Sequence, residues 1–168
     1  MKIVPDTSVV VDGRITQKIE EGDFKGAKVI VHESVVAELE SQANKGRETG
    51  HNGIEELKHL SELAENGHIV LEYEGKRPTL EEVKMAKGGE IDAMIRALAV
   101  EHNATFVTSD GVQSEIAKAK GLEVIYLRPE EPEFGALEIE QYFDDVGASE
   151  GGRRTQGETR RRRRYAFP

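Results

Sequence analysis

Short apolar segments rich in β-branched residues alternate along this chain with amphipathic helical segments, and this alternation constrains the fold most. The candidate strands are residues 2–4, 28–31, 69–71, 105–108 and 123–127. The candidate helices are residues 34–44, 54–65, 90–101 and 111–120. Strands that alternate with helices form a parallel sheet, and almost wholly apolar strands are buried on both faces. We therefore expect an α/β fold of three layers, α/β/α, with a central parallel sheet of about five strands.

The length of 168 residues fits one such domain. We place it at residues 1–130, followed by a short helix or extension over residues 131–146. Residues 147–168 are rich in Gly and Arg with few apolar residues, which predicts a disordered tail. The chain shows neither a membrane-spanning apolar run nor a signal peptide. Zero cysteines exclude disulfides and thiolate metal sites and fit a cytoplasmic protein.

The net charge of −9 conceals an acidic body and a basic end. Residues 151–168 hold seven arginines and one glutamate, whereas residues 1–150 hold 16 basic and 31 acidic side chains. An acidic body argues against a broad nucleic-acid surface, because phosphate binding generally uses basic patches. The question is then whether some of these acids form a site or all of them are solvated surface residues.

Four acids from distant segments are expected at the same edge of the sheet. Asp6 follows the first strand, Glu38 lies early in the helix after the second, Asp92 lies in the first turn of the helix before the fourth, and Asp110 follows the fourth. In an open parallel sheet the functional crevice lies beyond the carboxyl ends of the strands, where the strand order reverses. Acids gathered there need cations, and no Lys/Arg cluster accompanies these segments. Mg²⁺ or Mn²⁺ with oxygen ligands is the simplest solution.

Each acid also has a purely structural interpretation. Asp6 and Asp110 could cap the helices that follow them. Asp92 could favour a helix N-terminus or pair with Arg96, and Glu38 could be one of many solvated acids. Their shared position at one end of the sheet favours a metal site, in which such an ion activates water and stabilises the leaving oxygen of a phosphodiester.

The segments around these acids resemble the motifs of PIN-domain nucleases. The motifs are Val4-Pro5-Asp6-Thr7-Ser8, Val36-Ala37-Glu38-Leu39, Gly89-Glu90-Ile91-Asp92-Ala93-Met94-Ile95 and Thr108-Ser109-Asp110. The resemblance covers residues 1–130 and implies a PIN-like fold. It also implies a Mg²⁺- or Mn²⁺-dependent nuclease, foremost an endoribonuclease, that binds RNA or single-stranded nucleic acid.

The same resemblance carries over a set of site residues. Asp6, Glu38, Asp92 and Asp110 are expected as catalytic residues and metal ligands. Thr7, Ser8 and Ser109 match positions that orient a carboxylate or a water, and they carry less weight. Glu90 is a further candidate, for which a plain acid at a helix start is the leading interpretation.

A closer resemblance is to the N-terminal domain of archaeal PIN-domain ATPases, in which ATPase and KH domains follow. It rests on residues 9–14, 38–44, 50–53 and 112–121. The chain lacks the Gly-x-x-x-x-Gly-Lys-Ser/Thr motif and resembles no second domain, so no ATPase activity is carried over. The implied partners are ATPase and KH domains in a longer parent chain, and a second copy in a homo-oligomer.

Other residues in these segments receive structural interpretations. We interpret Asp12 and Arg14 as packing at the end of the first helix. Residues 46–53, a Gly-flanked polar segment with Arg47, are interpreted as a connection between helices, although loops beside a crevice can grip phosphates. The five histidines show no metal-binding spacing and are interpreted as surface or hydrogen-bonded residues.

Two alternatives to a nuclease remain. A non-catalytic PIN module could serve oligomerisation, or the regulation of an ATPase or another nucleic-acid-processing partner. A phospho-receiver domain shares the parallel α/β architecture and a basic-Pro pair such as Arg128-Pro129. It lacks support because receivers carry an acceptor aspartate after the third strand, where this chain reads Leu-Glu-Tyr-Glu-Gly.

Overall fold

The structure is a computed structural model that describes residues 1–86 and 89–129. Residues 1–129 form one unit with its own core. The extension expected at residues 131–146 and the tail expected at residues 147–168 lie outside the described residues.

The central sheet has five parallel strands, as predicted. They are β1 (Lys2–Pro5), β2 (Lys28–His32), β3 (Val70–Glu74), β4 (Thr105–Thr108) and β5 (Val124–Tyr126), in the order β3-β2-β1-β4-β5. In the central strand, Ile3 is in register with Val29 on one side and with Thr105 on the other. The side chains of β1, β2 and β4 are almost all buried, because helices cover both faces of the sheet.

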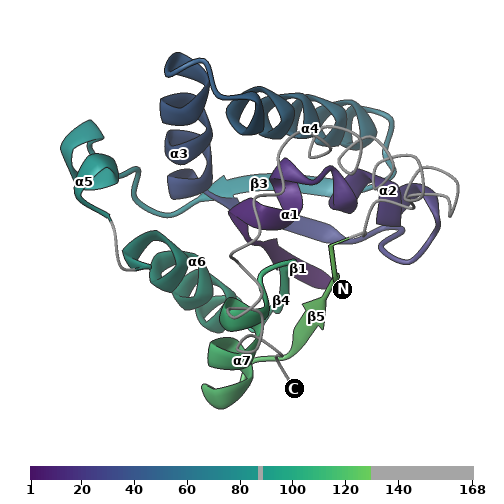
Figure 1. Cartoon of the computed structure of the whole chain (residues 1–168). Helices are drawn as coiled ribbons and strands as arrows, with labels where there is room; N and C mark the ends of the chain where they lie inside the picture. Colours follow the sequence, from purple (N-terminus) through teal and green to yellow (C-terminus); the bar gives the residue numbers. More distant parts are fainter. Residues whose placement is uncertain (87–88, 130–168) are drawn as a thin grey trace, which may run out of the picture. The chain divides into compact units, whose positions relative to one another are not determined.

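Helices form the two outer layers. Within the described residues they are α1 (Thr7–Val11), α2 (Arg14–Glu20), α3 (Glu33–Asn44), α4 (Glu48–Glu65), α5 (Leu80–Met85), α6 (Glu90–Glu101) and α7 (Gly111–Ala119). Parallel crossovers are right-handed, so connections that run to opposite sides of β1 cover opposite faces. Figure 1 accordingly shows α3 and α4 on one side of the sheet and α6 and α7 on the other. The three-layer α/β/α fold is thus confirmed, and none of the helices described is long and apolar enough to cross a bilayer.

The junction between α3 and α4 differs from the sequence expectation. Residues 46–53 are not a loop throughout, because α4 begins at Glu48. A Cβ atom at Gly50 would lie 2.2 Å from the backbone nitrogen of Ala43, and one at Gly53 would lie 2.3 Å from Cδ2 of Leu39. The glycines therefore permit close contact between two helices, which a single sequence does not distinguish from a loop signal.

The strand order reverses at β1, which places the expected crevice. From β1 the chain proceeds outward to β2, and it later returns to β4 on the opposite side of β1. Pairing between β1 and β4 continues to the last position, where the Asp6 backbone N–H donates to the Val107 carbonyl at 2.8 Å. Residues that follow β1 and β4 consequently lie side by side at this switch point.

Candidate functional site

A cavity of about 430 Å³ lies at the carboxyl ends of β1 and β4. All four acids predicted from the sequence line it: Asp6, Glu38, Asp92 and Asp110. They come from the end of β1, the second turn of α3, the first turn of α6 and the residue before α7. Segments separated by up to 104 residues in the chain thus converge on one cavity, as the parallel topology requires.

Asp6 is held rigidly by hydrogen bonds to both carboxylate oxygens. Oδ1 accepts from the Thr7 backbone N–H at 2.9 Å, and Oδ2 accepts from Thr108 Oγ1 at 2.9 Å and from Ser8 Oγ at 3.2 Å. The side chain is only 2% exposed, and burial raises its pKa although these hydrogen bonds act in the opposite direction. The helix-capping interpretation of Asp6 is therefore correct, and the same carboxylate faces the cavity.

Glu38 is held by a hydrogen-bonded chain that links α1 to α4. Its Oε2 accepts from Thr7 Oγ1 at 3.0 Å, and its Oε1 accepts from Gln42 Nε2 at 3.4 Å. The side-chain oxygen of Gln42, Oε1, accepts in turn from Thr49 Oγ1 at 2.7 Å. Burial raises the pKa of Glu38, and the negative charge of Asp6 raises it further. Glu38 is thus an oriented member of the cavity and not a freely solvated acid.

Asp110 caps α7 and still offers an oxygen to the cavity. Its Oδ1 accepts from the backbone N–H groups of Val112 at 2.8 Å and Gln113 at 3.2 Å, which leaves Oδ2 for a ligand. Beside it, Ser109 Oγ donates to Oδ2 of Asp12 at 2.7 Å, and Asp12 also lines the cavity. The interpretation of Asp12 as a packing residue is wrong, because its side chain is exposed at the site.

Asp92 is the acid with the most perturbed pKa. Burial, followed by the negative charges of Asp6 and Glu38, raises its pKa to about 6. The ion pair with Arg96, one of the two structural alternatives for Asp92, is not formed. The buried Arg96 guanidinium donates instead to Gln113, although its charge lowers the pKa of Asp92 somewhat. No hydrogen bond from the described residues reaches the Asp92 carboxylate, so both of its oxygens are free for a ligand.

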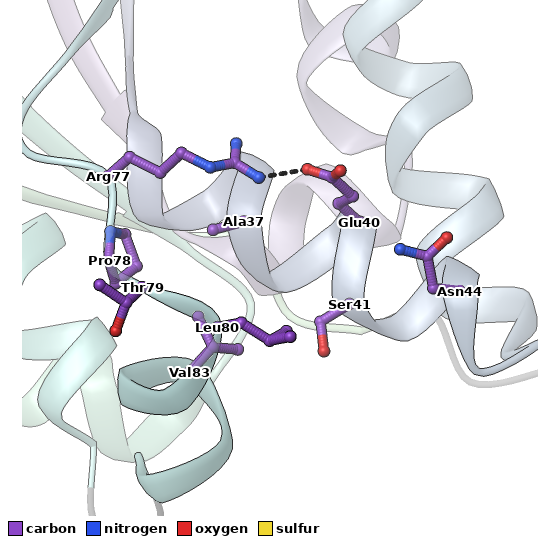
Figure 2. A pocket seen from close by; sticks show the side chains of 9 residues that line it. All are labelled: Ala37, Glu40, Ser41, Asn44, Arg77, Pro78, Thr79, Leu80 and Val83. Carbon is purple, nitrogen blue, oxygen red and sulfur yellow. Dashed lines mark hydrogen bonds and ion pairs between the residues drawn. The ribbon is translucent and has the colours of Figure 1, made fainter.

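A second cavity, of about 510 Å³, differs from the first because its charged side chains are paired. It lies between α3 and the segment around α5, and it contains none of the four acids (Figure 2). Its single carboxylate, on Glu40, is paired with Arg77, and the other lining side chains are neutral. The carboxylates of the first cavity have no such ion-pair partner among the described residues.

The donor set of the first cavity fits a partly hydrated Mg²⁺ or Mn²⁺. Within residues 1–86 and 89–129, no three His, Asp or Glu side chains form a ready-made ion cage. Magnesium retains several waters and typically takes only one or two carboxylates from a protein. Free oxygens on Asp92 and Asp110 in a cavity of this volume meet that requirement. Glu90 is exposed and does not line this cavity.

Replacing Asp92 by asparagine is expected to stabilise the metal-free protein above pH about 6. The folded-state pKa of about 6 lies above the ordinary 3.8, so the ionised form costs stability above pH 6, and this cost disappears as the pH falls towards 3.8. The gain is on the order of 1 kcal/mol, because solvent screens a half-buried group. Thermal unfolding in EDTA at pH about 7.5 and pH about 5 measures it. If the stability gain of Asp92→Asn over the wild type were as large at pH about 5 as at pH about 7.5, the raised pKa of Asp92 would not be its cause.

Residues 3–119 match the PIN domain family over more than half of the chain. The chain belongs to this family. This PIN domain is 52% identical over 144 residues to an uncharacterized KH and PIN-domain containing protein of Methanocaldococcus jannaschii, covering 86% of the chain and 22% of the relative. It is 26% identical over 147 residues to the Holliday junction branch migration ATPase PINA of Sulfolobus acidocaldarius, covering 88% of the chain and 26% of that protein.

A solved structure supports the same fold. A domain of a functionally unknown protein from Methanocaldococcus jannaschii is 53% identical to the chain and superposes with a TM-score of 0.74. The match covers 80% of this chain and 96% of that domain. Since the chain spans about a quarter or less of the length of its curated relatives, they match its PIN domain and extend well beyond it.

Several residues of the site were not singled out from the sequence. Thr108 orients Asp6, and Gln42 orients Glu38. Gln42 could have been found, since it lies four residues after Glu38 on the same helix face. Arg47 also lines the cavity. The sequence indicated this position only through the general tendency of loops near a crevice to bind phosphate.

Proposed function

We propose that this PIN domain is a divalent-metal-dependent endonuclease that hydrolyses phosphodiester bonds in RNA. Asp6, Glu38, Asp92 and Asp110 hold Mg²⁺ or Mn²⁺, and they are the catalytic residues. One observation carries the proposal: four carboxylates from distant segments line a single cavity without an ion-pair partner among the described residues. Burial, followed by repulsion from Asp6 and Glu38, raises the pKa of Asp92 to about 6. A carboxylate held in this way stabilises the fold poorly, which favours a functional reason for it.

The protein side chains divide the work of the site. A bound divalent ion supplies a lowered water pKa and positive charge that offsets the phosphate. Asp6 and Glu38 are held in one orientation by Thr7, Ser8 and Thr108, so they are in place before a substrate binds. Asp92 and Oδ2 of Asp110, which accept no hydrogen bond from the described residues, would provide oxygens to a bound ion or its waters.

The activity is tested with a labelled single-stranded RNA incubated with the chain and millimolar MnCl₂ or MgCl₂. We expect internal cleavage that requires the metal and that EDTA stops. A single-stranded DNA of the same sequence distinguishes the nucleic-acid class. If neither oligonucleotide, nor a structured RNA, is cleaved at high protein concentration, the proposed function is wrong.

The relatives favour a second candidate, a non-catalytic module within a longer chain. One relative is named as a KH and PIN-domain protein and the other as an ATPase, and the chain matches about a quarter or less of each. In this alternative the parent chain carries KH or ATPase domains, and the PIN domain assembles as a homo-oligomer or regulates its neighbours. Light scattering that shows an oligomer, combined with no cleavage of any substrate, would favour this candidate. The absence of cysteine fits a cytoplasmic location under both the nuclease and the non-catalytic candidate.

A further inference from the structure

Arg47 is the single Lys or Arg among the described residues that line the carboxylate cavity. It stands directly before α4, on the short connection from α3. The other lining residues are five acids and neutral side chains. A lone cation among the carboxylates of this cavity requires an explanation, because residues 1–150 carry 31 acidic and only 16 basic side chains.

The backbone at Arg47 is fixed by the contact between α3 and α4. The Arg47 backbone N–H donates to the Gln42 backbone carbonyl at 3.0 Å, after a turn through Gly46 with a φ of 72°. Two residues later, the Thr49 hydroxyl donates to the Gln42 side chain at 2.7 Å. Gly50 then packs against the backbone of α3. The base of the Arg47 side chain is thus held at one place on the cavity rim.

The guanidinium of Arg47 is nevertheless unpaired. It forms no hydrogen bond or ion pair with the described residues, and it does not cap α4. Three other arginines of the described residues differ, since Arg77 pairs with Glu40, Arg96 donates to Gln113, and Arg14 donates to the Arg128 carbonyl. The Arg47 head group therefore shares a cavity with carboxylates without being neutralised by one of them.

We propose that Arg47 binds a backbone phosphate of the nucleic-acid strand, adjacent to the phosphate that is cleaved. A guanidinium suits this task because it presents paired N–H donors to two phosphate oxygens. The contact sets the register of the strand, and it provides local attraction on a body that is otherwise acidic. This inference rests on the proposed function, and it adds a substrate-binding residue that touches the strand.

The first test is the salt dependence of strand binding. Fluorescence anisotropy measures the Kd of a short labelled single-stranded RNA, in CaCl₂ and at several KCl concentrations. We compare the wild-type chain with Arg47→Ala, Arg47→Lys and the control Lys45→Ala. Lys45 is exposed on the same connection and does not line the cavity. Arg47→Ala should raise Kd about 10-fold. It should also reduce the slope of log Kd against log[KCl] by about 0.7, the value for one phosphate contact on a single strand.

The two other variants and the cleavage kinetics complete the test. Arg47→Lys should recover part of the slope and less of the affinity, since it keeps the charge and loses the paired donors. Lys45→Ala should have the Kd and the salt slope of the wild-type chain. In MnCl₂, Arg47→Ala should raise KM more than it lowers kcat. If Arg47→Ala binds and cleaves like Lys45→Ala, this inference is overturned while the nuclease proposal stands. If the wild-type chain neither binds nor cleaves, both are overturned.

Discussion

Asp92→Asn is expected to lower Mn²⁺-dependent cleavage of RNA by more than about 100-fold, a larger loss than the 10- to 100-fold typical of residues that merely support metal ligands. The carboxylate of Asp92 accepts no hydrogen bond from the described residues, so its oxygens are available to a metal ion. The amide retains the shape of the side chain and removes the charge. Asp6→Asn should cause a comparable loss, because Asp6 is the buried carboxylate at the centre of the site. Initial rates at saturating MnCl₂ measure both effects.

The control for these variants is Glu40→Gln. Glu40 lies two residues from Glu38 on α3, and it is exposed and lines the other cavity (Figure 2). Removal of this charge should leave the cleavage rate within about 2-fold of wild type, because Glu40 does not line the carboxylate cavity. It should also leave the fold intact, because an exposed ion pair contributes little to stability. Thermal unfolding separates lost catalysis from lost folding, since Asp92→Asn is expected to be the more stable protein. Wild-type rates in both Asp6→Asn and Asp92→Asn would remove the carboxylates from the mechanism.

Gly50→Ala is expected to destabilise the domain by about 2 kcal/mol, within the range for overpacked cores. The added methyl group would lie 2.2 Å from the backbone nitrogen of Ala43 and 2.7 Å from the Leu39 carbonyl oxygen. Backbone atoms cannot rotate away, so α3 and α4 must move apart. This cost exceeds the roughly 1 kcal/mol that alanine gains over glycine inside a helix. Urea unfolding followed by circular dichroism measures the difference.

Gly111→Ala is the matched control for this substitution. Gly111 also lies in a helix, but a Cβ atom there would approach no atom closer than 3.5 Å, an ordinary contact with Tyr126. Its stability should change by less than about 0.5 kcal/mol or increase slightly. Equal urea midpoints for Gly50→Ala and Gly111→Ala would show that the helices tolerate the methyl group. The close contact between α3 and α4 would then not be the reason for Gly50.

The sheet and the four acids were predictable for one physical reason. Buried parallel strands are short, apolar and β-branched, so their ends can be read from the sequence. Once the ends are known, residues after parallel strands must lie at one edge of the sheet. Asp6 and Asp110 follow directly from this rule, and Glu38 and Asp92 follow from helices that begin near the same edge. The resemblance of the surrounding segments to PIN-domain motifs points to the same four positions.

The features that escaped the sequence depend on contacts between distant segments. The start of α4 was missed because Gly50 and Gly53 indicate a loop unless the neighbouring helix is known. Asp12 lines the cavity and accepts a hydrogen bond from Ser109, which is 97 residues away in the chain. Arg47 was part of an expected connection, and its place on the cavity rim depends on how α3 and α4 cross. Local patterns therefore predict the positions of the four acids, and tertiary contacts define their surroundings.

The central claim is that the carboxylate cavity binds a divalent metal, and a crystal soaked in millimolar MnCl₂ tests it most directly. Anomalous scattering identifies manganese without reference to any assumed geometry. We predict a peak between Asp6, Asp92 and Asp110, with waters completing its coordination. An empty cavity between these three carboxylates at that concentration would contradict the account.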